Sequence, residues 1–270
     1  MSEKLCIFHA DCIDGFTAAW VVSRHVAGWN EATFYPASYG EDPPDVEGME
    51  VIIVDFSYPR GRLEHMYKQA QSSLRVYDHH KTAQAELVGL DYCTFDMDRS
   101  GAGLAWDELV RPGLPRPLLI EVVEDRDLWR FDNPNTKAIH PAIEATDMTF
   151  EAWDHLAERK KGDLIHAGTA IQAYLTKSSK SARATAKKEV LQGHFVSTVN
   201  LQGQSASEVL NDLLAESNEQ FVVGYFRRAD GKWQMMLRSR PDFDCSVVAQ
   251  HFGGGGHAQA AGFVMTKLPW

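Results

Sequence analysis

The stretch SLRVYDHHKT, residues 73–82, carries the pattern from which the fold can be deduced. Its β-prone half is followed at once by Asp78, His79 and His80. We predict a strand that delivers one carboxylate and two imidazoles to its C-terminal end, which is the edge where open α/β sheets bind ligands. A polar turn that holds two histidines is the competing interpretation of these residues alone, because polar clusters also form for structural reasons.

Apolar runs alternate with helical segments on both sides of this stretch. The run at 49–54 is apolar apart from Glu50 and is followed by Asp55, as is typical of a parallel strand buried on both faces. The run at 118–123 leads in the same way into the acidic residues that follow it. Further strands are expected at 4–8, 33–37, 74–77 and 91–95, and helices at 16–26, 59–71 and 100–109. This alternation predicts an α/β domain with a doubly wound, mainly parallel sheet.

A smaller α/β unit is expected to follow a helical connector. The residues from 163 to 192 are rich in Ala and Lys and have helical character. Strands are then expected at 195–199, 221–226, 233–237 and near Phe263, with helices at 206–215 and 243–252. We therefore predict a first domain over residues 1–165, a connector over 166–192 and a second domain over 193–270.

Composition and charge narrow the classes of function. The four cysteines are scattered and form no C-x-x-C pair, which argues against a thiolate zinc site and favours a reducing, cytoplasmic setting. The formal net charge of −10 has the wrong sign for a protein that grips long nucleic acids by its surface. No apolar run approaches the roughly 20 residues needed to span a bilayer, and the N-terminus lacks the features of a signal peptide.

Hard metal ligands occur at four places where strands are expected to end, the run at 118–123 being taken as one of these strands. The residues concerned are His9, Asp11 and Asp14; Asp55; His79 with Asp78 and His80; and Asp125 with Asp127. A single aspartate at such a place commonly caps a helix, and Asp11 or Asp14 could cap the helix that begins near Phe16. Capping does not explain why carboxylates and imidazoles recur at four junctions on the edge where a parallel sheet binds ligands.

The ligand types indicate which metals such a site would hold. Carboxylates dominate, imidazoles are few and thiolates are not required, which favours Mn²⁺ or Mg²⁺. Two such ions roughly 4 Å apart can hold both the attacking and the leaving oxygen of an in-line displacement at phosphorus. Asp55 is the natural bridging ligand, because its single carboxylate can face both ions.

A second candidate site lies in the C-terminal unit. The run Gly253-Gly254-Gly255-Gly256-His257 can turn sharply and direct several backbone N–H groups at one anion. Arg238 and Arg240 end the preceding strand and could bind phosphate or carboxylate. A flexible glycine loop beside surface arginines is the alternative, although the compact residues that follow His257 favour an ordered loop.

Together these motifs resemble the DHH phosphoesterases. The motifs are HADCIDG (9–15), IIVDF (52–56), YDHHKT (77–82), SGAGLAW (100–106), EDRDLW (124–129), RSR (238–240) and GGGGHAQAAGF (253–263). The C-terminal part is similar to the DHH-associated substrate-binding domain of the same family. The resemblance implies a two-metal phosphohydrolase, usually manganese-dependent, with Mg²⁺ as the alternative ion.

The resemblance also implies a role for each site residue. One ion would be held by His9, Asp11 and Asp55, and the other by Asp14, Asp55, His79 and Asp125. His80 would contact the scissile phosphate or act as the acid, Asp78 would orient its neighbours, and Ser100 would cap a helix or contact phosphate. The terminal phosphate or nucleotide of the substrate would be held by Arg238, Gly254, Gly255, Gly256 and His257. The chain departs from many family members in having two residues, Cys12 and Ile13, between Asp11 and Asp14.

The leading hypothesis is an exonuclease or phosphodiesterase that acts on short single-stranded oligonucleotides or nucleotides. A 3′,5′-bisphosphate nucleotide phosphatase and a cyclic- or linear-dinucleotide phosphodiesterase share the same residues. An inorganic pyrophosphatase fits the glycine loop less well, and a non-catalytic nucleotide-binding module would need a broken ligand set. No membrane partner is expected, and the oligomeric state is left open, a homodimer included.

Overall fold

The computed structural model describes residues 2–201 and 206–270. The chain divides into two compact units, and the division falls between Ile171 and Gln172. No helix in the described residues combines the length and the apolar character needed to cross a membrane.

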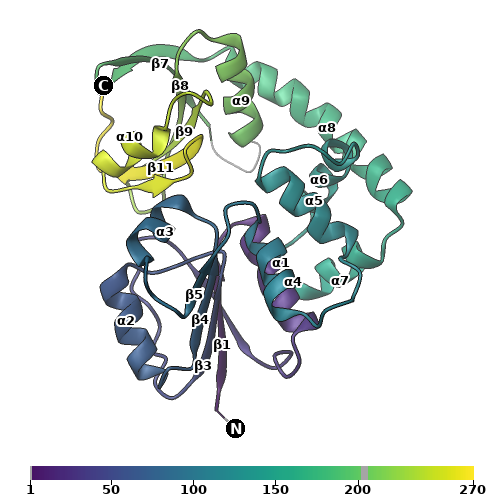
Figure 1. Cartoon of the computed structure of the whole chain (residues 1–270). Coiled ribbons are helices and arrows are strands. Elements are labelled where there is room, and N and C mark those ends of the chain that lie inside the picture. Colours follow the sequence, from purple (N-terminus) through teal and green to yellow (C-terminus); the bar gives the residue numbers. More distant parts are fainter. Residues whose placement is uncertain (1, 202–205) are drawn as a thin grey trace. The chain divides into compact units, whose positions relative to one another are not determined.

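Five parallel strands form the sheet of the first unit in the part of the chain that is described (Figure 1). They are β1 (Lys4–His9), β2 (Thr33–Ala37), β3 (Glu50–Val54), β4 (Leu74–Asp78) and β5 (Cys93–Phe95), in the order β2-β1-β3-β4-β5. Phe8 of β1 pairs with Val54 of β3, and Val54 pairs with Tyr77 of β4. These three strands therefore end level with one another, beside the point between β1 and β3 where the strand order reverses and such sheets bind ligands.

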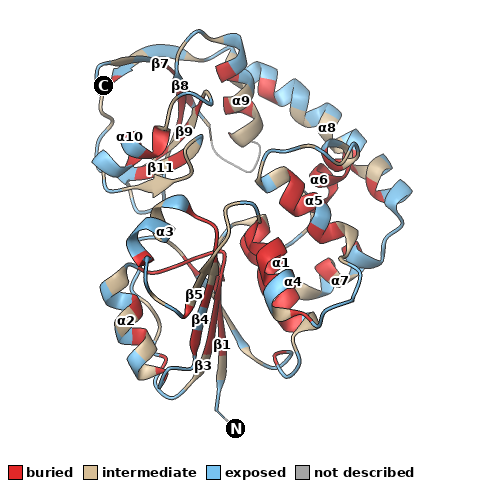
Figure 2. Ribbon diagram, viewed as in Figure 1, coloured by how far each residue is buried: buried red, intermediate tan, exposed pale blue. Residues whose placement is uncertain are grey.

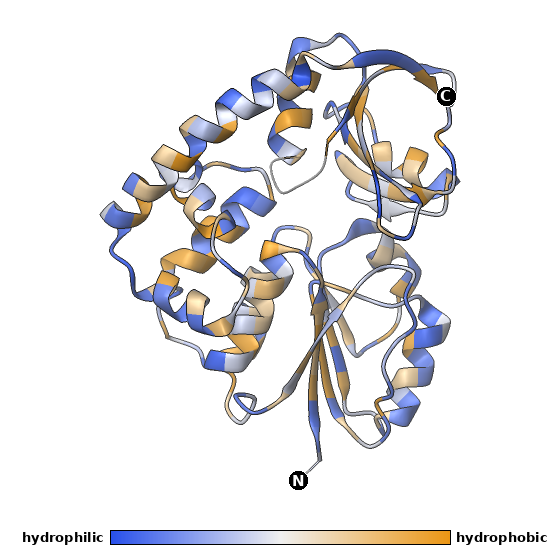
Figure 3. Ribbon diagram, turned by 180° about the vertical axis from the view of Figure 1, so that it is seen from behind, coloured by the Kyte–Doolittle hydropathy of each residue, from blue (hydrophilic) through white to orange (hydrophobic). Residues whose placement is uncertain are grey.

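Helices cover both faces of this sheet, as a doubly wound fold requires. On one face lie α1 (Ile13–His25) and α4 (Gly101–Leu109), and on the other lie α2 (Arg60–Gln69) and α3 (Lys81–Leu87) (Figure 1). Side chains of β1 alternate between the faces: Cys6 and Phe8 join one apolar cluster, whereas Leu5 and Ile7 join the other. The inner strands β1 and β3 are accordingly buried along most of their length (Figure 2), and apolar residues recur along the strands of this sheet (Figure 3). The predicted fold class is confirmed.

Three further helices enlarge the cluster on the α1 and α4 face. They are α5 (Leu118–Asp127), α6 (Thr136–Glu144) and α7 (Phe150–Glu158). The prediction of a strand-like run at 118–123 was wrong. The run begins after Pro117, buries its apolar residues around an exposed Glu121 and continues as a helix, and a short apolar run cannot be told from a buried helix by its periodicity alone.

The predicted helical connector is also shorter than expected. Helix α8 (Lys161–Arg183) is followed by strand β6 (Lys187–Leu191), which the sequence interpretation had placed in the helix. Gln192 and Gly193, with φ of 50° and 80°, link β6 to the next strand. Two such residues with positive φ are what a type I′ hairpin turn needs, and Gln-Gly is a weaker signal for it than Asn-Gly.

The second unit contains a mixed six-stranded sheet in the order β10-β11-β9-β8-β7-β6 over the described residues. Its other elements are β7 (His194–Asn200), α9 (Ala206–Glu216), β8 (Phe221–Arg227), β9 (Trp233–Ser239), α10 (Cys245–His251), β10 (Gly255–Gly256) and β11 (Ala260–Met265). Strands β7 and β8 are parallel and are joined through α9, whereas the other neighbours are antiparallel. Apolar side chains of α9 and of α10 belong to two separate clusters of this unit.

Candidate metal centre

The ends of β1, β3 and β4 bring polar side chains to one edge of the first unit's sheet. His9 ends β1, Asp55 follows β3 and Asp78 ends β4. Asp55 has a φ of 54°, a strained conformation that aspartate tolerates better than most residues and that is often found at functional sites. Helix α4 approaches so closely that a Cβ at Gly101 would lie 2.3 Å from Cβ of Asp55. A glycine in the SGAG motif is therefore required to seat this helix against the carboxylate.

The carboxylate of Asp55 faces histidines on two sides. Its Oδ1 lies 3.0 Å from Nε2 of His79, and its Oδ2 lies 3.5 Å from Nδ1 of His9. In the described part of the first unit, two groups have ligand atoms within 4.8 Å of one another: His9, Asp55 and His80, and Asp14, Asp55 and His79. Asp55 belongs to both groups, which is the arrangement expected of a carboxylate shared by two ions.

Uncompensated negative charge accumulates around the second group. Oδ2 of Asp14 and Oδ2 of Asp127 lie 3.6 and 3.7 Å from Nε2 of His79. Burial, together with the charges of Asp55 and Asp127, raises the pKa of Asp14 well above its ordinary value. Burial likewise raises the pKa of Asp127. A bound divalent cation would relieve this repulsion.

The buried polar atoms of the first group fit a metal ion as well. Nδ1 of His9 and Oδ2 of Asp55 are both buried and have no hydrogen-bond partner. Buried polar atoms are almost always satisfied in proteins, so each exception needs a cause such as an ion. Burial alone would raise the pKa of Asp55, but its interactions with His79 and His9 outweigh burial and hold the pKa well below the usual range. The carboxylate and imidazole donors suit Mn²⁺ or Mg²⁺.

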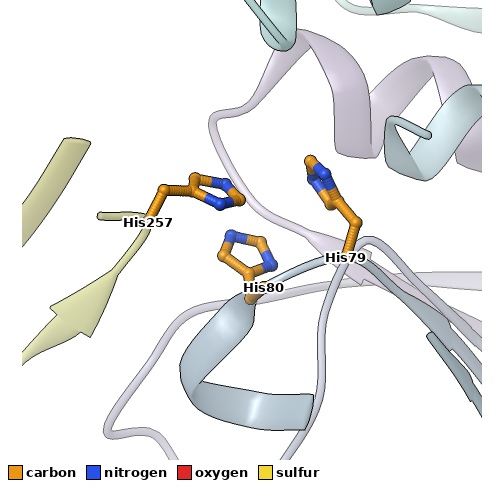
Figure 4. A group of neighbouring side chains, drawn as sticks. All are labelled: His79, His80 and His257. Carbon is orange, nitrogen blue, oxygen red and sulfur yellow. The ribbon is translucent and has the colours of Figure 1, made fainter. Parts of the chain in front are cut away.

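Asp78 is fully buried and holds both histidines of the DHH motif. Its Oδ1 accepts hydrogen bonds from the backbone N–H groups of His79 and His80, at 2.7 and 3.2 Å, and lies 2.7 Å from Nδ1 of His80. The two rings lie side by side, with centroids 5.1 Å apart (Figure 4). Burial lowers the pKa of His80, but the charge and hydrogen bond of Asp78 outweigh it, so that the pKa is raised. Asp78 thus fixes the orientation of His80 and favours its protonated form.

The N-terminus of α4 binds a carboxylate of the centre. Asp14 accepts hydrogen bonds from the N–H groups of Gly101 and Ala102, at 2.5 and 3.0 Å, and helix N-termini favour negative charge. The fully buried Ser100 caps the helix, because its Oγ accepts a hydrogen bond from the N–H of Gly103. Of the two roles predicted for Ser100, the structure shows the helix cap, and the phosphate contact remains a prediction.

The structure separates the roles of Asp125 and Asp127. The carboxylate of Asp125 accepts hydrogen bonds from the N–H groups of Asp132 and Asn133 and from the hydroxyl of Thr136. It therefore holds the loop after α5, and these contacts favour Asp127 over Asp125 as the candidate ligand. Residues two positions apart on a helix point about 200° apart, so only one of the two can face the centre. Asp127 is that residue.

Three residues near the centre differ from their expected roles or were not expected there. Asp11 is exposed in the turn after β1, and neither group of ligand atoms includes it. Cys12 was not singled out from the sequence, yet burial and the charges of Asp55 and Asp14 raise the pKa of its thiol. Tyr39 was missed as well, although its ring lies 5.4 Å from that of His9. The available signal was its position two residues after a predicted strand, on the ligand-binding edge.

In the second unit, packing accounts for much of the predicted anion site. A Cβ at Gly254 would lie 2.1 Å from the carbonyl oxygen of Gly262 in β11. Gly256 has a φ of 134° and pairs with Ala261. Gly255 pairs with Gly262 in the same ladder, and the N–H of His257 donates to the carbonyl of Ala260. The loop is thus ordered, as expected, by backbone pairing.

The two arginines of the RSR motif are engaged within the second unit. Arg238 donates to Oγ of Ser207 at 2.7 Å and to the carbonyl of Leu237 at 2.8 Å. Arg240 donates to carbonyl oxygens of the segment that closes α9, including those of Leu214 and Ser217. Arg240 therefore stabilises a helix end, and the substrate role of Arg238, Gly254, Gly255, Gly256 and His257 remains a prediction.

Comparison with known proteins agrees with this arrangement. Residues 192–269 match the family model of the DHHA1 domain. An uncharacterised protein of Acanthamoeba polyphaga mimivirus is 23% identical over 298 residues, covering 97% of this chain and 67% of that protein.

Solved structures share the fold at low sequence identity. One is the DHH domain of a protein described as a member of a family of ribosomal proteins, with a TM-score of 0.58, 13% identity, and coverage of 98% of this chain and 82% of that chain. Another is RecJ in complex with Mn²⁺ from Thermus thermophilus, with a TM-score of 0.53 and 16% identity. That match covers 98% of this chain and half of the RecJ chain. The C-terminal part of the chain therefore carries a DHHA1 domain, as the resemblance implied, and the chain shares the fold of these solved structures.

Proposed function

We propose that the chain is a metal-dependent phosphohydrolase that removes nucleotides one at a time from an end of short single-stranded oligonucleotides. The observation that carries this proposal is the position of Asp55 between two groups of ligand atoms. Such a pair of sites suits hydrolysis at phosphorus. The match of residues 192–269 to the DHHA1 domain supports the substrate-binding role that the resemblance implies for this part of the chain.

Different side chains would hold each of the two proposed ions, apart from Asp55, which would contact both. His9 with Asp55 would hold one divalent ion, and Asp14, His79 and Asp127 with Asp55 would hold the other. Two such ions supply Lewis-acid stabilisation of the charge that develops on a phosphoryl group. We propose Mn²⁺ as the ion, with Mg²⁺ as the alternative, because the donors are carboxylates and imidazoles.

His80 is the proposed proton donor to the leaving oxygen. Its Nδ1 is held by the buried carboxylate of Asp78 at 2.7 Å, which fixes the ring and keeps its pKa raised. A positioned acid with a pKa near the working pH is the most effective proton donor. His80→Ala should therefore lower turnover and leave the affinity for Mn²⁺ unchanged, whereas a loss of metal affinity would show that His80 is a ligand and not the acid.

Charge sets the proposed length of the substrate. A net charge of −10 disfavours a protein that follows many phosphates of a long strand, since such binding relies on a basic track. The four free cysteines fit a reducing cytoplasm as the proposed location.

Turnover of matched substrates tests this proposal. With Mn²⁺ present, we expect di- to pentanucleotides to be degraded faster than long single strands. A nucleoside 3′,5′-bisphosphate and a cyclic dinucleotide serve as comparison substrates for the two alternative activities. Faster turnover of either comparison substrate, or processive digestion of long strands at physiological salt, would contradict the proposal.

A further inference from the structure

We propose that Tyr39 is a substrate-contacting residue, and that its exposed ring is the stacking surface for the base of the nucleotide held at the metal centre. The inference rests on the proposed function and deepens it, because it names a substrate that carries an aromatic base. A substrate made of phosphate alone would have no use for such a surface.

Tyr39 lies directly beside the first group of ligand side chains. It follows β2, the edge strand next to β1, so the chain brings it to the edge of the sheet where His9 ends β1. Its ring centroid lies 5.4 Å from that of His9 and 5.9 Å from that of His80. The planes meet at 71° and 77°, so both histidines are approached edge to face.

The ring is held in place and yet remains open to solvent. Phe56, which follows the bridging Asp55, packs against it with centroids 4.7 Å apart and is itself 1% exposed. Tyr39 nevertheless keeps 53% of its surface exposed. Three rings therefore fix one side of Tyr39, while more than half of its surface is left for another molecule. A tyrosine that served only to fill the core would be buried.

Base stacking is the chemistry that fits such a surface. Every nucleobase presents a π-face, so one aromatic ring can accept any base without hydrogen-bond readout. A base is separated from its own phosphate by a single sugar. A ring that contacts the metal-centre histidines therefore lies within reach of the base of the nucleotide whose phosphate is attacked. We expect the enzyme to prefer a substrate with a base strongly over one without, and to distinguish the four bases from one another only weakly.

A purely supporting role is the alternative to be separated. Tyr39 could act only by packing against His9 and orienting it. In that case its replacement would weaken metal binding and lower the turnover of every substrate to the same extent. If Tyr39 stacks on a base, its replacement should lower the turnover of a substrate that has bases and spare the same backbone without bases. If Tyr39 only supports His9, both substrates should lose turnover equally.

The test compares an adenine dinucleotide with the same sugar–phosphate dinucleotide lacking both bases, using the full chain with Mn²⁺. We expect Tyr39→Leu to lower kcat/KM for the adenine dinucleotide by at least about 10-fold, with the loss mainly in KM. The abasic dinucleotide should change by less than about 2-fold. Tyr39→Phe keeps the ring and should behave like the unaltered protein with both substrates.

Tyr174→Leu is the matched control, because Tyr174 is 73% exposed on α8. It should leave both substrates unaffected. Equal losses on the two substrates for Tyr39→Leu, with weaker Mn²⁺ binding by calorimetry, would overturn the inference. So would a Tyr39→Phe variant that loses as much as Tyr39→Leu. If the unaltered protein hydrolyses neither dinucleotide, the proposed function itself fails, and that outcome is distinct from the others.

Discussion

At the metal centre of the first unit, buried polar atoms face one another without hydrogen-bond partners, whereas in the glycine loop of the second unit the backbone is paired. Nδ1 of His9 and Oδ2 of Asp55 are the unsatisfied atoms. In the loop, Gly255 and Gly256 form a ladder with β11, and Gly254 is a glycine because β11 passes too close for a Cβ.

The difference shows which structural signs indicate an ion or ligand. A buried polar group without a partner costs free energy, so its retention points to something that binds there. Glycines that are explained by close packing give no such indication. The unsatisfied polar atoms of the candidate metal centre therefore indicate function, whereas the glycines of the loop indicate a contribution to stability.

The largest effect is expected from the bridging carboxylate. Asp55→Asn keeps a residue that tolerates positive φ but removes the charge shared by both groups. We expect kcat to fall on the order of 1000-fold, because charge stabilisation by the ions is worth several kcal/mol. Steady-state turnover and Mn²⁺ calorimetry would measure it.

Asp11→Asn is the matched control for this change. Asp11 also has a positive φ, of 51°, but it is exposed and lies outside both groups. The turnover of the Asp11→Asn variant should stay within about 2-fold of that of the unaltered protein. A loss as large as that of Asp55→Asn would return Asp11 to the ligand set.

The next effect separates the two aspartates of α5. Asp127→Asn should lower turnover roughly 10- to 100-fold, in the range found when groups that tune a metal site are removed. Asp125→Asn should instead lower the free energy of unfolding by about 1–3 kcal/mol, because its buried oxygens hold the loop after α5. Chemical denaturation alongside kinetics distinguishes them, and the reverse pattern would restore Asp125 as the ligand.

Asp127 also gives the metal-free protein a pH dependence. Because the pKa of Asp127 is raised in the folded state, its stability contribution is present below the ordinary value of 3.8 and is lost as the pH rises through the folded pKa. Metal-free protein should therefore unfold at a lower temperature at neutral pH than Asp127→Asn does. Added Mn²⁺ should reverse that order. An unchanged order with Mn²⁺ would argue against an ion at this position.

A smaller effect tests the packing role of the glycine loop. Gly254→Ala should lower the free energy of unfolding by about 1–3 kcal/mol, since its Cβ would meet backbone atoms that cannot move away cheaply. Gly61→Ala, in α2 with nothing within 4 Å, should be neutral or raise stability by up to about 1 kcal/mol. Denaturant unfolding monitors both. Full stability in Gly254→Ala would show that packing does not explain this glycine.

The smallest effect concerns an ion pair of the second unit. Burial opposes ionisation of Glu219, but its hydrogen bonds with Lys188 and Ser217 lower its pKa to about 2. Its contribution is thus present above the ordinary pKa of 4.5 and is lost as the pH falls through about 2. Because Lys188 is largely exposed, Glu219→Gln should cost only about 1 kcal/mol at pH 7. The difference from the unaltered protein should vanish near pH 2 in denaturant titrations, and a constant difference would contradict the assignment.

Much of the fold could be read from periodicity, and the failures have physical causes. The apolar run Val51–Val54, followed by Asp55, predicted a buried parallel strand, because side chains on both faces of such a strand must be apolar. Pattern alone could not show that 118–123 is helical, because a short apolar run fits either element. The Gln192-Gly193 turn was missed because its conformation depends on a residue that seldom signals it.

The sequence predicted which types of residue form the candidate site, but it predicted only in part which residues lie together there. The recurrence of carboxylate and imidazole at strand ends predicted His9, Asp55 and His79 as neighbours. The choice between Asp125 and Asp127 depended on helical rotation, which the strand-like interpretation did not include. Tyr39 lay outside the motifs, and only the three-dimensional contacts of its ring revealed its place.

The most direct test is the anomalous scattering of Mn²⁺ in crystals of the full chain. The account predicts two peaks roughly 4 Å apart, one on each side of the Asp55 carboxylate, with His9 at one and His79 at the other. A single peak, or two peaks that share no ligand at Asp55, would contradict it.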